Sequence, residues 1–298
     1  MLGNWQLENP VIPASGTFGW GYEFAEWFDI NILGSISLKG TTLKPCAGNP
    51  TPRIAECRNG ILNSIGLQNP GVDAVISNEI PQLRKKFNKK IIANIAGTNL
   101  EEYVQVATLF DTVDVVALLE INVSCPNVKR SGMTFGTSPE SVSNICHNIK
   151  NAVKKPVYMK LSPNVTNIVE IAKAAETAGA DGLVLVNTFS GMAIDPATGK
   201  PVISTKLGGF SGPAIKPIAL RIVYQVYEHV KIPIIGSGGI VCADDVIEFI
   251  SAGATAVQIG AQNLVDPFVC PNIVKKLPQK MDQYKIKSLS EIIGRSHL

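Results

Sequence analysis

The amino-acid sequence predicts an α/β fold, a (β/α)8 TIM barrel that residues 1–298 form as one domain. Short apolar runs rich in β-branched residues alternate with longer segments of helical periodicity, a pattern typical of parallel strands joined by crossover helices. This alternation repeats about eight times, as a closed barrel requires. The length of 298 residues suits one such barrel, and no Pro/Ser-rich linker divides the chain.

The strands are expected, in chain order, at residues 10–14, 33–38, 91–96, 115–122, 157–161, 182–187, 232–236 and 256–260. Helices are marked most clearly at 138–155, 164–179, 213–230 and 244–253. Ser138 and the proline after it suit the start of the first helix, and Gly179 suits the end of the second. Residues 279–298 are expected to add a terminal helix. A doubly wound sheet is the alternative arrangement, but the G-x-G-x-x-G fingerprint usual in that fold is absent.

Two segments interrupt the alternation of strands and helices. Residues 40–70 follow the second predicted strand and are punctuated by proline and glycine, and residues 126–137 follow the fourth and are polar. Long loops in compact domains are often binding loops, and loops after barrel strands lie on the catalytic face. We therefore expect both segments, as loops, beside the active site.

Charge and hydropathy exclude several classes of protein. The 27 basic and 24 acidic residues leave a net charge of +3, too small to indicate nucleic acid or an anionic membrane surface as a partner. The most apolar runs are strand-sized, far short of the roughly 20 residues of a membrane span. The first residues lack the basic start and long apolar region of a secretory signal. We therefore expect a cytoplasmic location.

The cysteines and histidines lack the spacing of a metal site. No C-x-x-C pair occurs, so neither an iron–sulfur cluster nor a disulfide framework is expected, and the thiols suit a reducing compartment. His147, His229 and His297 lie on predicted helices or in the tail without ligand spacing. We expect no metal on this chain. The six cysteines are Cys46, Cys57, Cys125, Cys146, Cys242 and Cys270.

Polar residues end most of the predicted strands. One such residue is ordinary loop chemistry, but lysines and asparagines in buried strands are costly unless they have partners. The carboxyl ends of barrel strands meet on one face, where barrel enzymes carry their active sites. Together these residues predict one polar site. They are Ser15, Gly16, Lys39, Gly40, Asn94, Asn122, Cys125, Lys160, Asn187, Thr188, Gly236–Gly239, Gly260 and Ala261.

The glycine-rich end of the seventh predicted strand is a candidate phosphate site. Gly236-Ser-Gly-Gly239 runs toward a helix that starts near Asp244, so its backbone N–H groups could bind an anion. Barrels commonly bind phosphate at strands seven and eight, and Gly260 ends the eighth. A simple tight turn is the alternative interpretation of this tetrapeptide.

Cys125 is the candidate for chemistry. It follows a strand end, precedes Pro126 and opens a glycine-containing segment, so we expect a cavity to receive its thiol. The other five cysteines are expected to be small buried apolar residues.

Four motifs in the sequence resemble the dihydroorotate dehydrogenase family, and the resemblance covers nearly the whole chain. They are Ser37–Gly40 (SLKG), Asn63–Gly71 (NSIGLQNPG), Asn122–Asn127 (NVSCPN) and Gly236–Gly239 (GSGG). Cys125 in the NVSCPN motif resembles the cysteine base of class 1 enzymes of this family. Asn49–Arg53 (NPTPR) and the SIGLQNPG loop resemble the NAD-linked subclass 1B. The resemblance implies an FMN-binding (β/α)8 barrel that oxidises (S)-dihydroorotate to orotate in pyrimidine biosynthesis.

The resemblance also implies a role for each matching residue. Cys125 would remove the C5 proton of the substrate while hydride passes from C6 to flavin N5. The substrate would be held by Lys39, Asn63, Ser64, Ile65, Gly66 and Leu67 at its carboxylate and by Asn122, Asn187 and Thr188 at its ring. The flavin would contact Ser15, Lys39, Gly40, Asn94, Asn122, Lys160 and Val186, with Lys160 near N1/O2. The phosphate would lie against Gly212, Gly238, Gly239, Gly260 and Ala261, where the family usually has threonine at the last position.

An electron-transfer partner is implied as well. This chain has neither an NAD fingerprint nor cluster cysteines. The resemblance implies a second subunit that carries FAD and a [2Fe–2S] cluster and passes electrons to NAD+. The expected assembly is a homodimer of this chain within a heterotetramer. Three alternatives stay open: a fumarate-linked class 1A enzyme, a dihydropyrimidine dehydrogenase catalytic chain, and a non-redox barrel that binds a phosphorylated metabolite.

Overall fold

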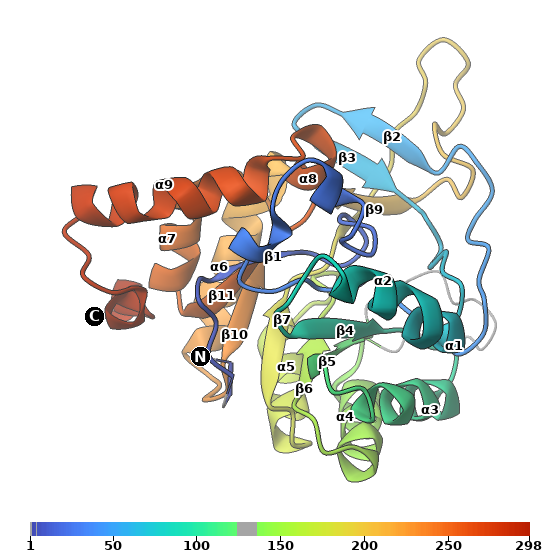
Figure 1. The fold of residues 1–298 in the computed structure, drawn as a ribbon. Coiled ribbons are helices and arrows are strands. Elements are labelled where there is room, and N and C mark those ends of the chain that lie inside the picture. The colour runs from blue at the N-terminus through green and yellow to red at the C-terminus, as the bar shows by residue number, and fades with distance from the viewer. Residues whose placement is uncertain (1, 4, 124–135) are drawn as a thin grey trace.

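A curled parallel sheet forms the centre of the molecule (Figure 1). The computed structural model describes residues 2–3, 5–123 and 136–298. Within them the parallel sheet has seven strands. Each of the seven corresponds to a predicted strand, so these predictions are confirmed. In spatial order they are β1 (Val11–Pro13), β11 (Ala254–Ile259), β10 (Ile234–Ser237), β7 (Gly182–Leu185), β6 (Val157–Lys160), β5 (Val116–Asn122) and β4 (Ile91–Ile95).

The remaining predicted strand, residues 33–38, forms no regular strand. This segment hydrogen-bonds to both edges of the sheet: Gly34 N–H donates to the Val11 carbonyl of β1 (3.0 Å), and Leu38 N–H donates to the Ile92 carbonyl of β4 (2.9 Å). Thr41 N–H then donates to the Asn94 carbonyl (3.0 Å). The donors Leu38 and Thr41 are three residues apart, but their acceptors on β4, Ile92 and Asn94, are only two residues apart. This additional residue acts like a bulge and interrupts the ladder.

Helices cover the outer face of the sheet (Figure 1). Ser138 caps α4 by accepting a hydrogen bond from Ser141 N–H (3.2 Å), and Asn167 caps α5 through Val169 N–H (3.2 Å). The predicted helices 138–155, 164–179, 213–230 and 244–253 are confirmed as α4, α5, α6 and α7. The described α-helices are α1 (Val72–Ala74), α2 (Ile80–Arg84), α3 (Leu100–Asp111), α4 (Pro139–Ala152), α5 (Ile168–Thr177), α6 (Lys216–Tyr227), α7 (Ala243–Ser251), α8 (Gln262–Val265) and α9 (Val269–Gln283).

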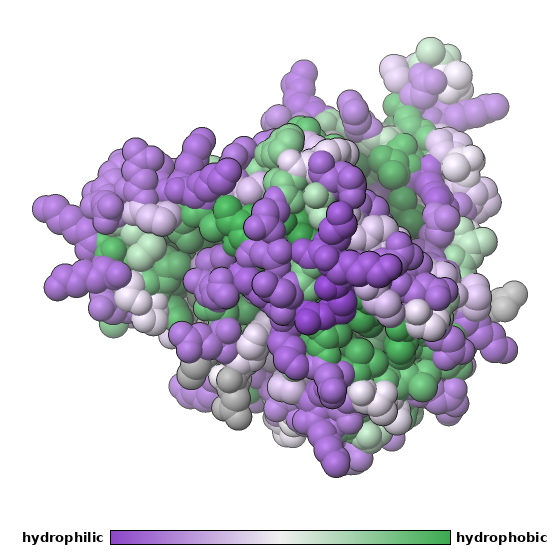
Figure 2. Space-filling model, viewed as in Figure 1, coloured by the Kyte–Doolittle hydropathy of each residue, from purple (hydrophilic) through white to green (hydrophobic). Residues whose placement is uncertain are grey.

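The predicted terminal helix over 279–298 is wrong in extent. Residues 279–283 complete α9, and only the short 3-10 helices Leu289–Ile292 and Arg295–His297 follow. Lys285 has φ +56°, a left-handed conformation that cannot continue an α-helix. Within the part of the chain that the structure describes, none of the helices combines the length and apolar character that a membrane crossing requires. On the face shown in Figure 2, hydrophilic side chains line α9.

A second, antiparallel sheet was not predicted. It pairs β2 (Ile54–Cys57), β3 (Gly60–Asn63), β9 (Gly208–Ser211) and β8 (Phe189–Gly191) in that order. The expectation that 40–70 is only a loop is therefore wrong. Asn59 (φ +58°) turns the β2–β3 hairpin, and β3 finds its other partner about 150 residues away, at Gly209–Ser211. Local sequence patterns carry no signal for such a pairing.

The strands of the parallel sheet bury a different set of residues on each face, because successive side chains of a strand point to opposite faces. One face packs against the helices in the main hydrophobic core. The other face forms a separate apolar cluster, which Trp5 and Leu7 of the N-terminal segment partly cover. The members of that cluster are Leu2, Ile12, Ile92, Leu118, Tyr158, Val184, Ile235 and Ala256.

On four strands of the parallel sheet, the residue two positions after the member of this apolar cluster is polar and buried, and its side chain points to the same face. They are Asn94 on β4, Glu120 on β5, Lys160 on β6 and Gln258 on β11. These polar residues lie nearer the carboxyl ends of the strands than the apolar cluster does. The same face of the sheet therefore carries an apolar layer followed by a polar layer toward the carboxyl ends.

Candidate active site

A cavity of about 280 Å³ opens at the carboxyl ends of the parallel strands. The residues that the sequence predicts for the site line it, with two exceptions. Gly236 is not among the lining residues, and Cys125 lies outside the described residues, as does most of the predicted loop 126–137. The roles of these residues stay predictions. The predicted residues that line the cavity are Ser15, Gly16, Lys39, Gly40, Asn63, Ser64, Ile65, Gly66, Leu67, Asn94, Asn122, Lys160, Val186, Asn187, Thr188, Gly212, Ser237, Gly238, Gly239, Gly260 and Ala261.

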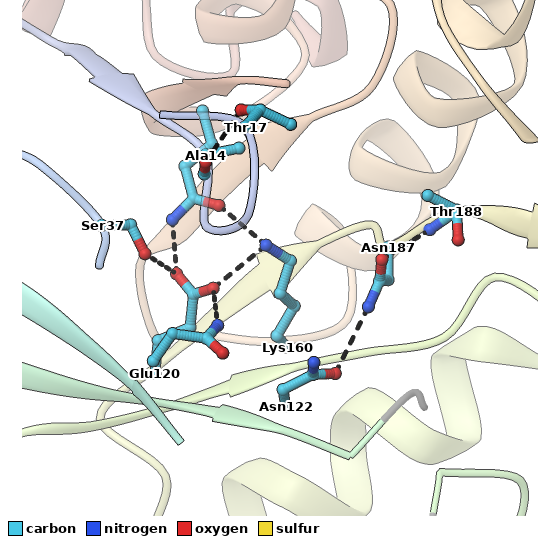
Figure 3. Close-up of polar contacts among 10 residues, drawn as sticks. Ala14, Thr17, Ser37, Glu120, Asn122, Lys160, Asn187 and Thr188 are labelled. Atoms are coloured by element: carbon cyan, nitrogen blue, oxygen red, sulfur yellow. Dashed lines mark hydrogen bonds and ion pairs between the residues drawn. The ribbon is translucent and has the colours of Figure 1, made fainter. Parts of the chain in front are cut away.

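A buried ion pair joins Lys160, which lines the cavity, to Glu120, which does not. Lys160 Nζ lies 3.0 Å from Glu120 Oε1, and the Glu120 side chain is fully buried. Lys160 Nζ also donates to Gln258 Oε1 (3.0 Å), and Gln258 Nε2 donates to Glu120 Oε2. Ser37 Oγ donates to the same carboxylate oxygen at 3.4 Å. Figure 3 shows the Lys160 and Ser37 side chains converging on Glu120. The pair thus has the hydrogen bonds that make a buried ion pair tolerable.

Asn94 connects this ion pair to the cavity. Its Nδ2 donates to Glu120 Oε1 at 2.6 Å. Its Oδ1 is buried and accepts no hydrogen bond from any described residue. A buried amide oxygen without a donor is costly, so a ligand that supplies an N–H or O–H here would be bound favourably. Ser64 Oγ, which also belongs to a cavity-lining residue, is buried without a described partner in the same way.

Amide side chains form one wall of the cavity. Asn187 Nδ2 donates to Asn122 Oδ1 at 3.3 Å, and Asn187 Oδ1 accepts from Thr188 N–H at 2.8 Å. Figure 3 shows these three residues in a row beside Lys160. Tyr103 Oη donates to the Asn122 carbonyl at 2.7 Å and anchors the end of β5. The row offers both donors and acceptors, which suits a planar ring with imide or amide edges.

The segment after β3 forms another wall. Its backbone is held by Asn49, whose N–H donates to the Ile65 carbonyl (3.0 Å) and whose Nδ2 donates to the Ser64 carbonyl (2.9 Å). Gly66 has φ +75°, and a Cβ there would lie 2.7 Å from the Asn49 backbone nitrogen. Leu67 also has positive φ, +59°. The conformation therefore requires glycine at position 66, where the predicted substrate loop turns.

Glycines shape the end of the cavity that was predicted to hold phosphate. Gly239 has φ +74°, and a Cβ there would lie 2.7 Å from the Lys216 backbone nitrogen. At Gly212, with φ +119°, a Cβ would lie 2.6 Å from the Cα of Gly60. These close backbone approaches leave no room for side chains, so main-chain groups line this end. That lining suits an anion.

Sequence reasoning missed Glu120 and Gln258 and assigned no role to the Ser37 side chain. Neither Glu120 nor Gln258 lines the cavity, but both hold residues that do. The signal was a charged residue inside the otherwise apolar run Val116–Ile121, two positions before Asn122 and therefore on the same face of the strand. Strand β9 was missed with the antiparallel sheet, and its Gly209 carbonyl accepts from Asn63 Nδ2 (3.4 Å).

The described cysteines do not line the cavity. Burial raises the pKa of the Cys146 thiol to about 12 and raises the pKa of Cys270 as well, so neither is ionised near neutral pH. Cys46, Cys57 and Cys242 are half-buried, which corrects the expectation that all five are buried. Among the described residues, no group of three His, Cys, Asp or Glu side chains could hold a metal ion.

Comparisons with known proteins agree on one family. A sequence model of the dihydroorotate dehydrogenase family matches residues 1–281. The chain is 55% identical over 290 residues to the catalytic subunit of dihydroorotate dehydrogenase B (NAD(+)) of Geobacillus sp. (strain WCH70), across 97% of this chain and 92% of the relative. Catalytic subunits of the same description from Bacillus cereus (strain B4264) and Bacillus pumilus (strain SAFR-032) are 54% and 53% identical across 97% of this chain and 94% and 93% of the relatives. The chain therefore belongs to the dihydroorotate dehydrogenase family.

Proposed function

We propose that this chain is the FMN-dependent catalytic subunit of an NAD-linked dihydroorotate dehydrogenase. It oxidises (S)-dihydroorotate to orotate in de novo pyrimidine biosynthesis, and the electrons leave through a partner subunit to NAD+. The observation that carries the proposal is one cavity that combines two lysines, a row of amides and a glycine-lined end in a chain of this family. We place the enzyme in the cytoplasm.

We also propose that the parallel sheet closes into a (β/α)8 barrel that forms one domain. The support is segment 34–41, which hydrogen-bonds to β1 through Gly34 and to β4 through Leu38 and Thr41. Ser37 of this segment also points to the inner face, since its hydroxyl reaches Glu120. A segment bonded to both edges of an open sheet takes the place of the eighth strand.

The residues of the cavity fit FMN. Asn94 Oδ1 needs a donor, which an isoalloxazine ring or its ribityl hydroxyls can supply. In our proposal Ser15, Lys39, Gly40, Asn94, Asn122, Lys160 and Val186 hold the ring, and Gly212, Gly238, Gly239, Gly260 and Ala261 hold the phosphate. When bound, FMN supplies the acceptor for the hydride that the substrate loses. Lys160 provides positive charge where electron density increases.

The substrate occupies the remaining space between the amide row and the segment after β3. Lys39, Asn63 and Ser64–Leu67 bind its carboxylate, and Asn122, Asn187 and Thr188 bind its ring. Cys125, three residues after the cavity-lining Asn122, takes the C5 proton on its thiolate sulfur. A thiol suits this step because its unperturbed pKa of about 8.5 lies near physiological pH.

The first test identifies the chromophore. The purified protein is expected to be yellow, to release FMN on denaturation, and to lose its visible absorbance when dihydroorotate is added without oxygen. The absorbance spectrum, followed by chromatography of the released flavin, measures this. Release of FAD, or a colourless protein from riboflavin-supplied cells, would contradict the proposal and favour a non-redox barrel.

The second test concerns the partner. We propose a homodimer of this chain within a heterotetramer, whose second subunit carries FAD and a [2Fe–2S] cluster. The isolated chain is then expected to bleach with dihydroorotate and to reduce NAD+ only poorly, while NAD+ reduction rises when the second subunit is added. Stopped-flow absorbance at the NADH and flavin bands measures both steps. Efficient NAD+ reduction by the homogeneous isolated chain would refute the need for a partner, and efficient reoxidation by fumarate would indicate class 1A.

A further inference from the structure

We propose that Glu120 is a positioning residue that tunes the flavin site without touching it. It compensates the charge of Lys160, and it turns the Asn94 amide so that the amide oxygen serves the cavity. The inference rests on the proposed function, because it requires FMN in the cavity.

Each carboxylate oxygen of Glu120 accepts hydrogen bonds from two donors. Oε1 accepts from Asn94 Nδ2 (2.6 Å) and Lys160 Nζ (3.0 Å). Oε2 accepts from Ser37 Oγ (3.4 Å) and from Gln258 Nε2. The donors come from β4, β6, β11 and segment 34–41, on both sides of β5. Figure 3 shows Glu120 at the centre of this network, set apart from the Asn122–Asn187–Thr188 row.

The orientation of the Asn94 amide follows from this network. An asparagine side chain can present either its NH₂ group or its oxygen in a given direction, and a carboxylate is an acceptor only. Glu120 therefore selects the NH₂ group, and the amide oxygen must point elsewhere. That oxygen is near Gly40, whose Cβ, if present, would lie 3.0 Å from it. Gly40 and Asn94 both line the cavity, so this unpartnered oxygen lies beside it, and in our proposal a donor on the bound flavin reaches it.

The charge of the flavin site also depends on Glu120. The Lys160 ammonium and the Glu120 carboxylate together carry no net charge, and the exposed fraction of Lys160 is only 5%. Charges interact strongly where water is excluded. Without the carboxylate, an uncompensated ammonium would face the flavin and favour its electron-rich reduced form. Glu120 therefore keeps the reduction potential of the bound flavin lower than Lys160 alone would make it.

The network allows a matched exchange of charge. Glu120→Gln removes the carboxylate with almost no change of shape, but its amide nitrogen would face the Gln258 nitrogen, a second donor. Gln258→Glu in the same chain removes that conflict: the new carboxylate accepts from Lys160 Nζ, where Gln258 Oε1 now accepts at 3.0 Å, and from the new amide at position 120. The new amide oxygen still accepts from Asn94 and Lys160. The double variant E120Q/Q258E thus restores the charge and every hydrogen-bonded pair, with the Ser37 hydroxyl as acceptor.

The test measures the midpoint potential of FMN in the purified holoenzyme by spectroelectrochemical titration, without dihydroorotate. E120Q is expected to raise the ratio of reduced to oxidised flavin at a fixed potential tenfold or more, a shift of about 30 mV or more for a two-electron couple. E120Q/Q258E is expected to return the potential to that of the unmodified protein. If Glu120 had only a structural role, E120Q would alter how well the protein retains flavin. It would not raise the midpoint potential, and the double variant would not return that potential to normal.

Other results of this titration would overturn the inference about Glu120, the proposed function, or both. An unshifted or lowered potential in FMN-loaded E120Q overturns the inference and leaves the proposed function intact. If E120Q fails to fold or retain FMN, the double variant is expected to fold and bind FMN with the normal potential, and its failure to do so overturns the inference. Absence of flavin from the unmodified protein overturns the proposed function together with this inference.

Discussion

Replacement of Cys125 by alanine is expected to slow the reduction of the flavin by dihydroorotate by roughly 10²–10⁴-fold, the usual contribution of a positioned acid–base group. The substrate still binds, because the lysine and amides that hold it are unchanged, but no group accepts the C5 proton. Serine at this position is expected to be nearly as slow near neutral pH, since its hydroxyl is a far weaker acid than a thiol. In the unmodified enzyme the rate is expected to rise with pH as the thiol ionises and then to level off.

Stopped-flow bleaching of the flavin under anaerobic conditions measures this rate directly, free of the partner subunit. Cys57→Ala is the matched control, because Cys57 is a half-buried cysteine of β2 that does not line the cavity. That variant should be reduced at the normal rate. If the alanine variant at 125 is also reduced at nearly the normal rate while retaining FMN, another group takes the proton and Cys125 is not the base.

Replacement of Lys160 by methionine is expected to destabilise the protein by about 3–5 kcal/mol, the range found when one partner of a buried ion pair is removed. Methionine has a similar length and fits an interior, so the loss reflects the Glu120 carboxylate left without its cation in a fully buried position. The double variant K160M/E120Q is expected to recover much of this loss, since an amide at position 120 is far less costly to bury without a cation.

Urea unfolding measures both variants, and titrations with and without excess FMN separate the intrinsic loss from stability contributed by the bound cofactor. Lys150→Met is a useful comparison, because the Lys150–Asp181 pair (2.6 Å) is partly exposed and should contribute at most about 1 kcal/mol. A cost below about 1 kcal/mol for Lys160→Met, or no recovery in the double variant, would show that the buried pair does not stabilise the fold as argued here.

The regular elements of the parallel sheet could be predicted because their signals are local. A strand buried on both faces is a short apolar run, and an amphipathic helix repeats its apolar residues every three or four positions. Seven strands and helices α4 to α7 follow from these signals. Segment 33–38 has the composition of a strand. The additional residue between Leu38 and Thr41 can be recognised only when their hydrogen bonds to Ile92 and Asn94 of the neighbouring strand are known.

The location of the candidate site could also be predicted, because parallel strands bring their carboxyl ends together. Lys39, Asn94, Lys160 and Asn187 are far apart in the chain, yet all of them line one cavity. Glu120 was overlooked although it lies on the same strand as Asn122. Its importance depends on Asn94, Lys160 and Gln258, which only the folded sheet brings within hydrogen-bonding distance of it.

By itself, the sequence determined the family, the alternation of strands and helices, and the set of polar residues at the strand ends, since each is encoded in contiguous motifs or in local periodicity. Only the tertiary structure decided the antiparallel sheet, where Gly60–Asn63 and Gly208–Ser211 pair across the chain, and the buried network around Glu120. Both depend on contacts between residues remote in sequence. The free energy of such contacts comes from burial and from hydrogen bonds between specific atoms, which no single stretch of sequence contains.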